Sequence, residues 1–235
     1  MWSGPRNIST ALMRSWENRP DAVVVDEPLY AYYLATTGLD HPGRDEVVAT
    51  GETDWRRVVD MLLGPVPPGT ALFYQKHMTG HLLPEVDRGW VRDLTNVILI
   101  RDPREVVASY TKARQTITPE DIGLPQQVRL YDELAADGLA PPVVDAADFL
   151  RDPASHLRAL CAYAGVEFTD RMLHWPAGPR DSDGVWAKHW YATVEKSTGF
   201  EPYRPREPQL AGAAAEVAAA CRPHYERLRE HRLQL

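Results

Sequence analysis

The sequence predicts an α/β fold in which a parallel β-sheet is flanked by helices. Along the 235 residues, short apolar or β-branched runs alternate with stretches of helical periodicity, a pattern typical of parallel sheets covered by helices. The side chains are 44% hydrophobic and 25% charged, the composition of a globular chain long enough to bury its own core. No internal repeat or linker interrupts the pattern, so we expect one domain over residues 1–235.

Four runs are expected to form the strands of this sheet, and they span residues 22–25, 71–74, 96–100 and 143–145. Between the first two, apolar residues recur at helical spacing over residues 55–63, which predicts a helix with one apolar stripe for the sheet. Another amphipathic helix is expected to begin at Pro153 and to end at Gly165.

The last sixty residues combine a long loop with a helical segment. Residues 176–208 hold many prolines, glycines and aromatic side chains without a clear period, which indicates an ordered loop because linkers rarely carry so many tryptophans and tyrosines. Loops of this kind usually have a function. From Gln209 on, the chain is alanine-rich and helical. We expect Pro223 to split this segment into two helices, because proline removes a helix hydrogen bond.

Charge and hydropathy exclude several classes of protein. The chain has 33 acidic and 26 basic side chains and a net charge of −7, which argues against broad nucleic-acid binding because phosphate contacts need a basic face. No run approaches the roughly 20 apolar residues of a membrane span, and the start lacks the features of a signal peptide. We therefore expect a cytoplasmic protein with no membrane or nucleic-acid partner. In that compartment Cys161 and Cys221, on apolar helix faces, are expected to be reduced and buried.

A loop leads into a helix N-terminus near the start of the chain. Its residues are Ser3, Gly4, Pro5, Arg6, Asn7, Ile8, Ser9 and Thr10. Unpaired N–H groups and the positive end of the helix dipole converge at such a junction, which predicts a site for a phosphate-like group. The loop lacks the Gly-Lys-Ser/Thr of the nucleoside-triphosphate P-loop, which disfavours a kinase. The alternative is an ordinary loop with a Ser/Thr cap.

A second anion site is expected after the strand at residues 96–100. Arg101 stands at the carboxyl end of this strand, and Ser109 lies on the helix that follows, where Val106, Val107 and Tyr110 point inward. Ligands of open α/β sheets bind outside the carboxyl ends of the strands, so Arg101 and Ser109 can meet a second phosphate. Alternatively, Arg101 forms a salt bridge with a nearby carboxylate and Ser109 is a neutral helix residue.

The order and separation of these two motifs resemble the sulfotransferases that use 3′-phosphoadenosine 5′-phosphosulfate (PAPS). The resemblance extends through residues 148–153, which look like the strand-to-helix stretch of the family, the helix at 157–165, and the tract at 178–191, which is similar to bacterial members of uncertain substrate. It implies a P-loop nucleoside-triphosphatase-like sulfotransferase fold and PAPS as donor co-substrate, without a metal. It also implies that Arg6 and the backbone from Gly4 to Thr10 bind the 5′ side of the donor. Arg101 and Ser109 would bind the 3′-phosphate.

The resemblance further assigns roles to Lys76 and Trp186. Family enzymes often place a lysine near a strand end, where it reaches the oxygen that bridges to the leaving phosphate, and Lys76 fits that context. The family order is Lys-x-His, whereas His77 adjoins Lys76 directly and His81 follows, so which histidine faces the substrate stays open. Trp186 is carried over as a donor-binding residue. Lys188 is a further candidate, although its tract departs by one residue from the Gly-x-Trp-Lys of cytosolic members.

Sulfuryl transfer also needs a base for the acceptor proton, by analogy with phosphoryl transfer. Glu27 resembles the strand-end glutamate that is the base in glycosaminoglycan-type sulfotransferases, and His77 corresponds to the histidine base of the cytosolic type. We favour Glu27. Alternatively, Glu27 caps a helix or pairs with an arginine, and His77 is a core histidine. Several aromatic residues could line an acceptor pocket for a small apolar or aromatic molecule, or pack in the core: Tyr30, Tyr32, Tyr33, Trp186, Trp190 and Tyr191.

Two readings from other classes stay open. The first is a nucleotide kinase or nucleoside triphosphatase, which would need magnesium and a triphosphate. The second is a nucleotide-binding module without transfer activity. This alternative arises because only Met1 and Trp2 precede the loop, whereas the fold expects a buried strand of about five residues there. Without that strand the loop would be poorly anchored and would bind the donor more weakly. His41, His174 and His189 lack metal-ligand spacing, so we assign them no metal. The sequence specifies neither the acceptor nor an oligomeric state.

Overall fold

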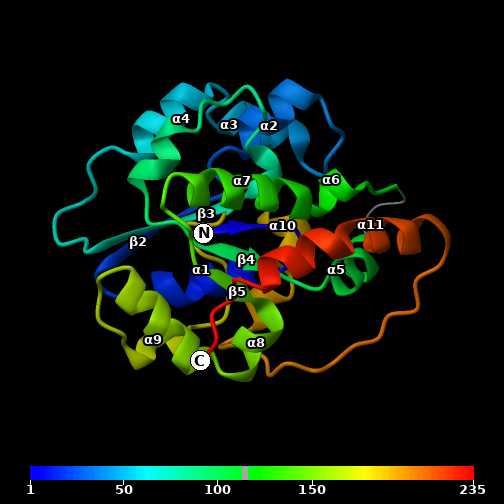
Figure 1. The fold of residues 1–235 in the computed structure, drawn as a ribbon. Helices are drawn as coiled ribbons and strands as arrows, with labels where there is room; N and C mark the ends of the chain where they lie inside the picture. The colour runs from blue at the N-terminus through cyan, green and yellow to red at the C-terminus, as the bar shows by residue number, and fades with distance from the viewer. Residues whose placement is uncertain (113–115) are drawn as a thin grey trace.

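The computed structural model describes residues 1–112 and 116–235, and it confirms an α/β fold with a parallel sheet. Five strands lie in the order β2-β3-β1-β4-β5, and each neighbouring pair runs parallel. They are β1 (Trp2–Ser3), β2 (Ala22–Asp26), β3 (Leu72–Met78), β4 (Ile98–Ile100) and β5 (Val143–Asp145). The sheet lies in the middle of the molecule, between two layers of helices (Figure 1).

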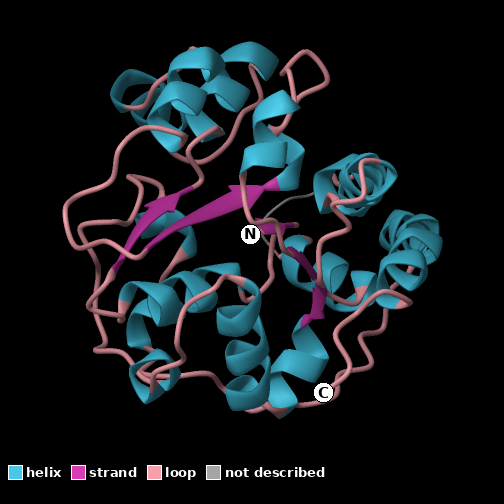
Figure 2. Cartoon of the chain, turned by 60° about the vertical axis from the view of Figure 1, so that its left-hand side comes forward, coloured by secondary structure: helices cyan, strands magenta, loops and turns pink. Residues whose placement is uncertain are grey.

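Helices cover both faces of the sheet (Figure 2). One apolar core holds side chains of α4 (Trp55–Leu62), α5 (Pro103–Tyr110), α7 (Leu124–Ala136) and α11 (Gly212–Arg229). The other holds side chains of α1 (Ser9–Glu17), α8 (Ala146–Arg151) and α9 (Pro153–Tyr163). Ile98 and Ile100 of β4 point into the first core and Leu99 into the second, as the alternation of strand side chains requires.

The remaining elements are short. They are α2 (Tyr30–Thr37), α3 (Arg44–Thr50), α6 (Pro119–Ile122), α10 (Ala187–Trp190) and the 3₁₀ turns η1 (Thr79–His81), η2 (Gly89–Asp93), η3 (Asp170–Leu173) and η4 (Val194–Lys196). A third apolar cluster joins α2 and α3 to α10. The expected long loop at 176–208 therefore contains α10 and η4 and packs against α2.

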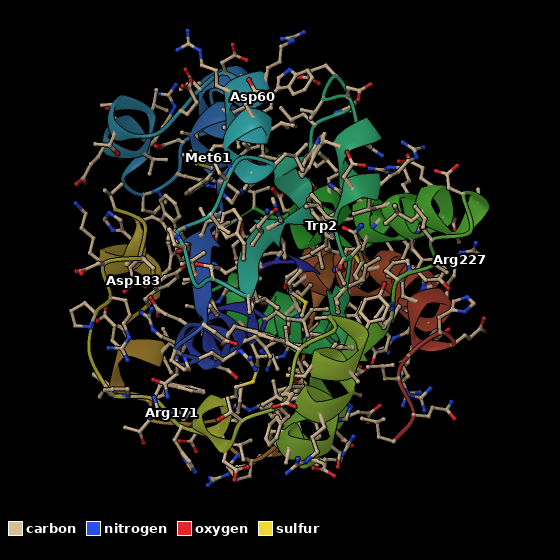
Figure 3. All side chains as sticks on the ribbon, turned by 90° about the vertical axis from the view of Figure 1, so that its left-hand side faces the viewer. Trp2, Asp60, Met61, Arg171, Asp183 and Arg227 are labelled. Atoms are coloured by element: carbon tan, nitrogen blue, oxygen red, sulfur yellow. The ribbon has the colours of Figure 1, made fainter. Side chains whose placement is uncertain are left out.

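The central position of the sheet is filled by β1, although this strand has only two residues. Trp2 donates its backbone N–H to Val97 O at 2.8 Å, and His77 donates to Met1 O at 2.9 Å. The side chain of Trp2 is buried in the interior (Figure 3) and donates to Asn96 Oδ1 at 2.8 Å. The loop that follows β1 is therefore anchored by a strand that is paired on both sides, although that strand is shorter than the five residues expected.

The bounds of β3 and β4 differ from the expected ones. β3 was expected to end at residue 74 but continues to Met78, because Lys76 pairs with Asp26 of β2 and His77 pairs with Trp2 of β1. Pairing on both sides keeps polar residues in the strand. β4 begins at Ile98 rather than at residue 96, because the side chain of Asn96 donates to the carbonyls of a preceding turn at 2.7 and 2.9 Å.

Two helices correct the sequence prediction. Pro223 does not split the C-terminal segment, since α11 is continuous through it. Side chains next to the proline hold the helix in place: Arg222 pairs with Asp102 at 2.9 Å, and Tyr225 donates to Asp145 at 2.5 Å. Packing thus outweighs the hydrogen bond that proline removes.

The stretch at 148–151, expected to lead from strand to helix, is already helical in α8. Asp145, the last residue of β5, accepts the N–H of Ala147 at 2.8 Å and so caps α8 directly. β5 thus ends at Asp145, where the sequence predicted the strand to end, and α8 follows it directly.

The two cysteines are buried on opposite faces of the sheet, Cys161 in the core beneath α9 and Cys221 in the core beneath α11. Within residues 1–112 and 116–235, no helix combines the length and apolar character that crossing a bilayer requires.

Candidate active site

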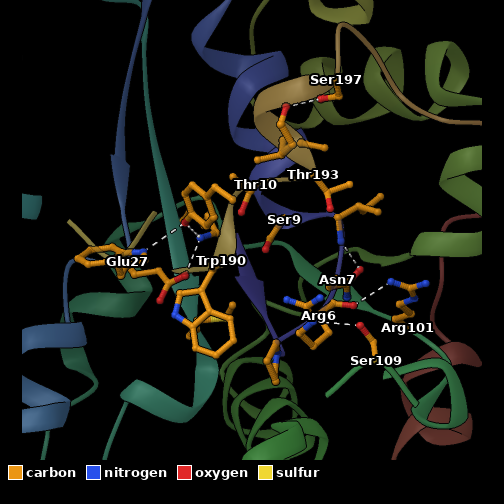
Figure 4. Close-up of a pocket in the computed structure, with 18 of the residues that line it drawn as sticks. Arg6, Asn7, Ser9, Thr10, Glu27, Arg101, Ser109, Trp190, Thr193 and Ser197 are labelled. Atoms are coloured by element: carbon orange, nitrogen blue, oxygen red, sulfur yellow. Dashed lines mark hydrogen bonds and ion pairs between the residues drawn. The ribbon is translucent and has the colours of Figure 1, made fainter. Parts of the chain in front are cut away.

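A cavity of about 380 Å³ opens at the carboxyl ends of the strands (Figure 4). The first four strands each send a segment to it: the loop after β1, Glu27 after β2, Lys76 within β3 and Arg101 after β4. This edge is where open α/β sheets bind their ligands. The two predicted anion motifs and the favoured base therefore line one cavity.

The loop after β1 contributes residues 5–10 to the cavity wall, whereas Ser3 and Gly4 lie behind it. Gly4 allows the loop to pass close to α6, because a Cβ there would lie 2.4 Å from Ile122 O. Asn7 shapes the turn, since its Oδ1 accepts the N–H of Ile8 at 2.8 Å. α1 begins at Ser9 without a side-chain cap, so the N–H groups of its first turn have no intrahelical partner. The alternative of a simple Ser/Thr cap is wrong.

Two residues at the cavity hold a strained backbone. Arg6 has φ 54° and Glu27 has φ 41°, and among the described residues other than glycine no further one has a positive φ. Such a conformation costs about 1–3 kcal/mol and persists where the surrounding structure imposes it, which is often a functional site. Both residues are ones that the sequence singled out.

The second anion motif meets the first in space. Arg6 Nε donates to Ser109 Oγ at 3.0 Å, and Arg101 Nη1 donates to Arg6 O at 2.8 Å. Arg101 also donates to Glu105 Oε2 at 2.8 and 3.0 Å, so the alternative of a salt bridge is realised as well. Tyr203 donates to the other oxygen of Glu105 at 3.0 Å. The guanidinium of Arg101 is thus held in place beside Ser109.

Lys76 is buried between two carboxylates. Its Nζ donates to Asp26 Oδ1 at 2.7 Å, to Glu27 Oε1 at 2.6 Å and to the hydroxyl of Tyr191 at 2.7 Å, and its side chain is 1% exposed. Burial by itself would lower the pKa of Lys76, but the charges of Asp26 and Glu27 outweigh it and raise the pKa well above its usual value. Lys76 is therefore a buried ammonium group. Tyr191 completes the cluster by donating to Asp26 Oδ2 at 2.6 Å.

His77 points away from the cavity, which corrects its place among the candidate bases. Lys76 and Met78 line the cavity, and the side chain between them must therefore point to the opposite face of the strand. There His77 stacks on Trp2 at 4.2 Å between ring centroids. Burial holds the pKa of His77 well below its ordinary value, so the ring is neutral. His77 is therefore a core histidine, the alternative that the sequence left open.

His81, which the sequence left undecided, lines the cavity. Its ring lies between those of Tyr30 and Tyr33, with centroids 4.7 and 4.6 Å away. Its Nδ1 lies 4.0 Å from Glu27 Oε2, the oxygen that Lys76 does not bind. Tyr30 also lines the cavity, whereas Tyr32 and Tyr33 lie outside its wall.

The long loop forms the wall opposite α1. Trp186, Trp190 and Tyr191 line the cavity, and six residues further along the loop do so as well: Thr193, Val194, Ser197, Gly199, Phe200 and Glu201. The loop is tied to α1 by a buried ion pair, in which Arg14 Nη2 lies 2.6 Å from Asp183 Oδ1. Lys188 points elsewhere and pairs with Glu46, so it is not a cavity residue.

No group of three or more His, Cys, Asp or Glu side chains in the described part of the chain is arranged to hold a metal ion. The cationic groups at the cavity are side chains: Arg6, Lys76 and Arg101. A negatively charged ligand would be balanced there by guanidinium and ammonium groups together with the N-terminus of α1.

Sequence comparison matches residues 1–232 to a family model described as "Sulfotransferase domain". Two proteins of Arabidopsis thaliana, named branched-chain-amino-acid aminotransferase-like proteins 2 and 1, are 37% and 38% identical over 232 residues. The match covers 98% of this chain and 41% of each relative. The chain thus spans about two fifths of the length of these relatives, and their names describe much longer proteins.

Solved structures with the same fold include three sulfotransferases. The sulfotransferase from Alicyclobacillus acidocaldarius has a TM-score of 0.56 and 17% identity, with 100% of this chain and 95% of that chain covered. The sulfotransferase domain from the curacin biosynthetic pathway gives 0.54 and 15%, with 93% and 94% covered. The domain from the olefin synthase of Synechococcus PCC 7002 gives 0.51 and 16%, with 93% and 92% covered. At these identities the likeness concerns the fold.

Proposed function

Because the chain belongs to the sulfotransferase domain family, we propose that it transfers a sulfuryl group from PAPS to a hydroxyl or amine of a small acceptor. The observation that carries the proposal is the meeting of two anion motifs in one cavity. Arg6 of the first motif is hydrogen-bonded to both residues of the second, through its side chain to Ser109 and through its carbonyl to Arg101. A nucleotide with phosphate groups at both its 5′ and 3′ positions presents two anions for two such motifs.

In the proposed complex, the backbone of residues 4–10 and Arg6 hold the 5′ side of the donor at the N-terminus of α1. Arg101 and Ser109 hold the 3′-phosphate. Glu105 keeps the guanidinium of Arg101 oriented, which lowers the cost of ordering it when the donor binds. Trp186, on the opposite wall, adds an aromatic surface for the donor.

Lys76 and Glu27 are proposed to act on the transferred group. The acceptor oxygen bonds to sulfur while the bond from sulfur to the bridging oxygen breaks, and the electron pair goes to the leaving phosphate. The ammonium group of Lys76 stabilises that charge. Glu27 takes the acceptor proton, and Glu27 Oε2 is the oxygen that Lys76 leaves unbound.

The acceptor is proposed to enter between α2 and α10, where aromatic side chains line the cavity. The whole cavity measures about 380 Å³ and has to take the donor as well, which favours a small acceptor.

Calorimetry with adenosine 3′,5′-bisphosphate, AMP and ATP with magnesium tests the donor assignment. We expect the bisphosphate to bind at least about tenfold more tightly than AMP, because one charge-assisted hydrogen-bond set is worth roughly 1.5–3 kcal/mol. Tighter binding of ATP with magnesium would favour the kinase. Sulfuryl transfer from PAPS then separates an enzyme from a binding module. Transfer that persists in excess EDTA needs no metal, which argues against the kinase.

A further inference from the structure

The ammonium group of Lys76 has no hydrogen-bond donor left for a ligand. It carries three N–H groups, and these donate to Asp26 Oδ1, Glu27 Oε1 and the hydroxyl of Tyr191 at 2.7, 2.6 and 2.7 Å. The ring of Tyr191 also lies beside the ammonium group, with its centroid 5.2 Å from Lys76 Nζ, and the lysine side chain is 1% exposed. The proposed function requires Lys76 to donate to the leaving phosphate. One of the three partners must therefore give up its bond when the sulfuryl donor binds.

The sheet holds the two carboxyl groups of Asp26 and Glu27 beside Lys76. Asp26, the last residue of β2, is in register with Lys76 on β3 and is not part of the cavity wall, so a ligand in the cavity is not placed to replace it. Glu27 does line the cavity, and its backbone N–H donates to Lys76 O at 2.8 Å. If Lys76 released Glu27, a buried carboxylate would lose its ammonium partner, which is costly. Neither residue is therefore suited to give up its bond.

Tyr191 is the partner that can give up its bond to Lys76. It lines the cavity and lies on the long loop, directly after α10. Burial raises the pKa of its hydroxyl, which is therefore neutral. A neutral oxygen binds an ammonium group less strongly than a carboxylate or phosphate oxygen does. The hydroxyl also donates to Asp26 Oδ2 at 2.6 Å and accepts from Trp186 Nε1 at 3.3 Å, so it keeps partners after it releases Lys76.

We infer that Tyr191 is a positioning residue for the transfer, whose hydroxyl holds one N–H of Lys76 until an oxygen of the leaving phosphate replaces it. The inference rests on the proposed sulfuryl transfer and adds a residue to that reaction. Asp26 and Glu27 stay bound to Lys76 throughout the exchange, so the ammonium group keeps its place. Lys76 is then fully hydrogen-bonded both without the sulfuryl donor and with it.

Removing the hydroxyl of Tyr191 tests the exchange, because the nucleotide then has no hydroxyl to displace from Lys76. Calorimetry compares Tyr191→Phe with the wild type for adenosine 3′,5′-bisphosphate and adenosine 3′-monophosphate. The bisphosphate brings a 5′-phosphate to Lys76, whereas the monophosphate lacks that group. We expect Tyr191→Phe to bind the bisphosphate roughly three- to tenfold more tightly than the wild type, the net effect of one hydrogen bond. Its affinity for the monophosphate should equal that of the wild type.

Two further variants are measured in the same titrations. Tyr32→Phe is the matched control, because the hydroxyl of Tyr32 donates to Glu85 at 3.0 Å outside the cavity wall. Its affinity for both nucleotides should equal that of the wild type. Glu27→Gln should bind the bisphosphate as the wild type does. If Glu27 were the partner that Lys76 releases, Glu27→Gln would instead bind more tightly and Tyr191→Phe would not.

A crystal structure of the wild type with adenosine 3′,5′-bisphosphate tests the same exchange without a variant. Lys76 Nζ should lie within hydrogen-bond distance of a 5′-phosphate oxygen, of Asp26 and of Glu27, and the hydroxyl of Tyr191 should lie beyond that distance. A complex in which Lys76 keeps Tyr191, or releases Glu27 in its place, would overturn the inference.

Equal or weaker binding of the bisphosphate by folded Tyr191→Phe would also overturn the inference and leave the proposed sulfuryl transfer standing. Equally tighter binding of both nucleotides would overturn it as well, because the gain would then not depend on the 5′-phosphate. A wild-type protein that does not bind adenosine bisphosphate would instead refute the proposed function, so the two failures are distinguishable.

Discussion

Replacing Glu27 by glutamine removes the proposed base and leaves its shape. Glu27 Oε1 accepts a hydrogen bond from Lys76 at 2.6 Å, and the carbonyl oxygen of glutamine can accept the same bond. Asp26 stays 2.7 Å from Lys76 and keeps the ammonium group paired. The donor end of the cavity, around Arg101, is untouched. Glu27→Gln should therefore bind adenosine 3′,5′-bisphosphate as the wild type does.

The expected loss is in turnover. An amide cannot take a proton at neutral pH, so kcat should fall by roughly 10²–10⁴, the usual contribution of a general base. Each factor of ten corresponds to about 1.4 kcal/mol of barrier, so the loss amounts to about 3–6 kcal/mol.

The assay is sulfuryl transfer from PAPS at saturating donor, with calorimetry on each variant to check donor binding. Glu46→Gln is the matched control, because Glu46 is an exposed carboxylate that pairs with Lys188 outside the cavity. His77→Asn should leave kcat near that of the wild type. If Glu27→Gln keeps full turnover while His81→Asn loses it with donor binding intact, His81 is the base and the reasoning about Glu27 is refuted.

Variants at three further positions test the structure around the site. Asp183→Asn leaves the buried Arg14 with only the longer contact to Glu17, at 3.6 Å, so we expect a loss of up to about 3–5 kcal/mol and a Tm lower by up to about 6–20 °C in calorimetric scans; an unchanged Tm would contradict a buried pair. Arg6→Gly should unfold at higher denaturant than Arg6→Ala, because only glycine adopts φ 54° without strain; the reverse order in urea titrations would argue against strain. The folded-state pKa of His77 lies well below 6.5, so the unfolded chain binds the proton first and stability falls as pH drops below about 6.5. Urea unfolding across this range should show a smaller slope with pH for His77→Gln, and an identical slope would count against a neutral buried ring.

The central residues of the strands could be predicted from the sequence, because a short apolar run is buried in a sheet whatever its neighbours are. β5 begins and ends at the expected residues, and the helix at 55–63 appears as α4. The extension of β3 to Met78 was not predictable, since polar side chains enter that strand only through pairing with β2 and β1. Pro223 shows the same limit, because local propensity opposed the helix and tertiary contacts kept it.

The cavity was predictable in part. Loop-to-helix junctions and strand ends can be read from sequence, and Glu27, Lys76 and Arg101 were found in this way. The contact between Lys76 and Tyr191 spans 115 positions and depends on the path of the long loop, which has no period to read. Asp26 was within reach of sequence reasoning, because it directly precedes Glu27 at the same strand end.

Strand register determines which of the adjacent residues Lys76 and His77 faces the cavity. Adjacent residues on a strand point to opposite faces, so only one of the two can face the cavity once both lie within β3. The parallel register decides which, because it sets Lys76 beside Asp26 at the end of β2. The ammonium group then lies between Asp26 and Glu27, and His77 is left to stack on Trp2 in the core. The register of β3 against β2 thus places the charged side chain of Lys76 in the cavity and that of His77 in the core. Of the two bases that the sequence offered, Glu27 is therefore the one that lines the cavity.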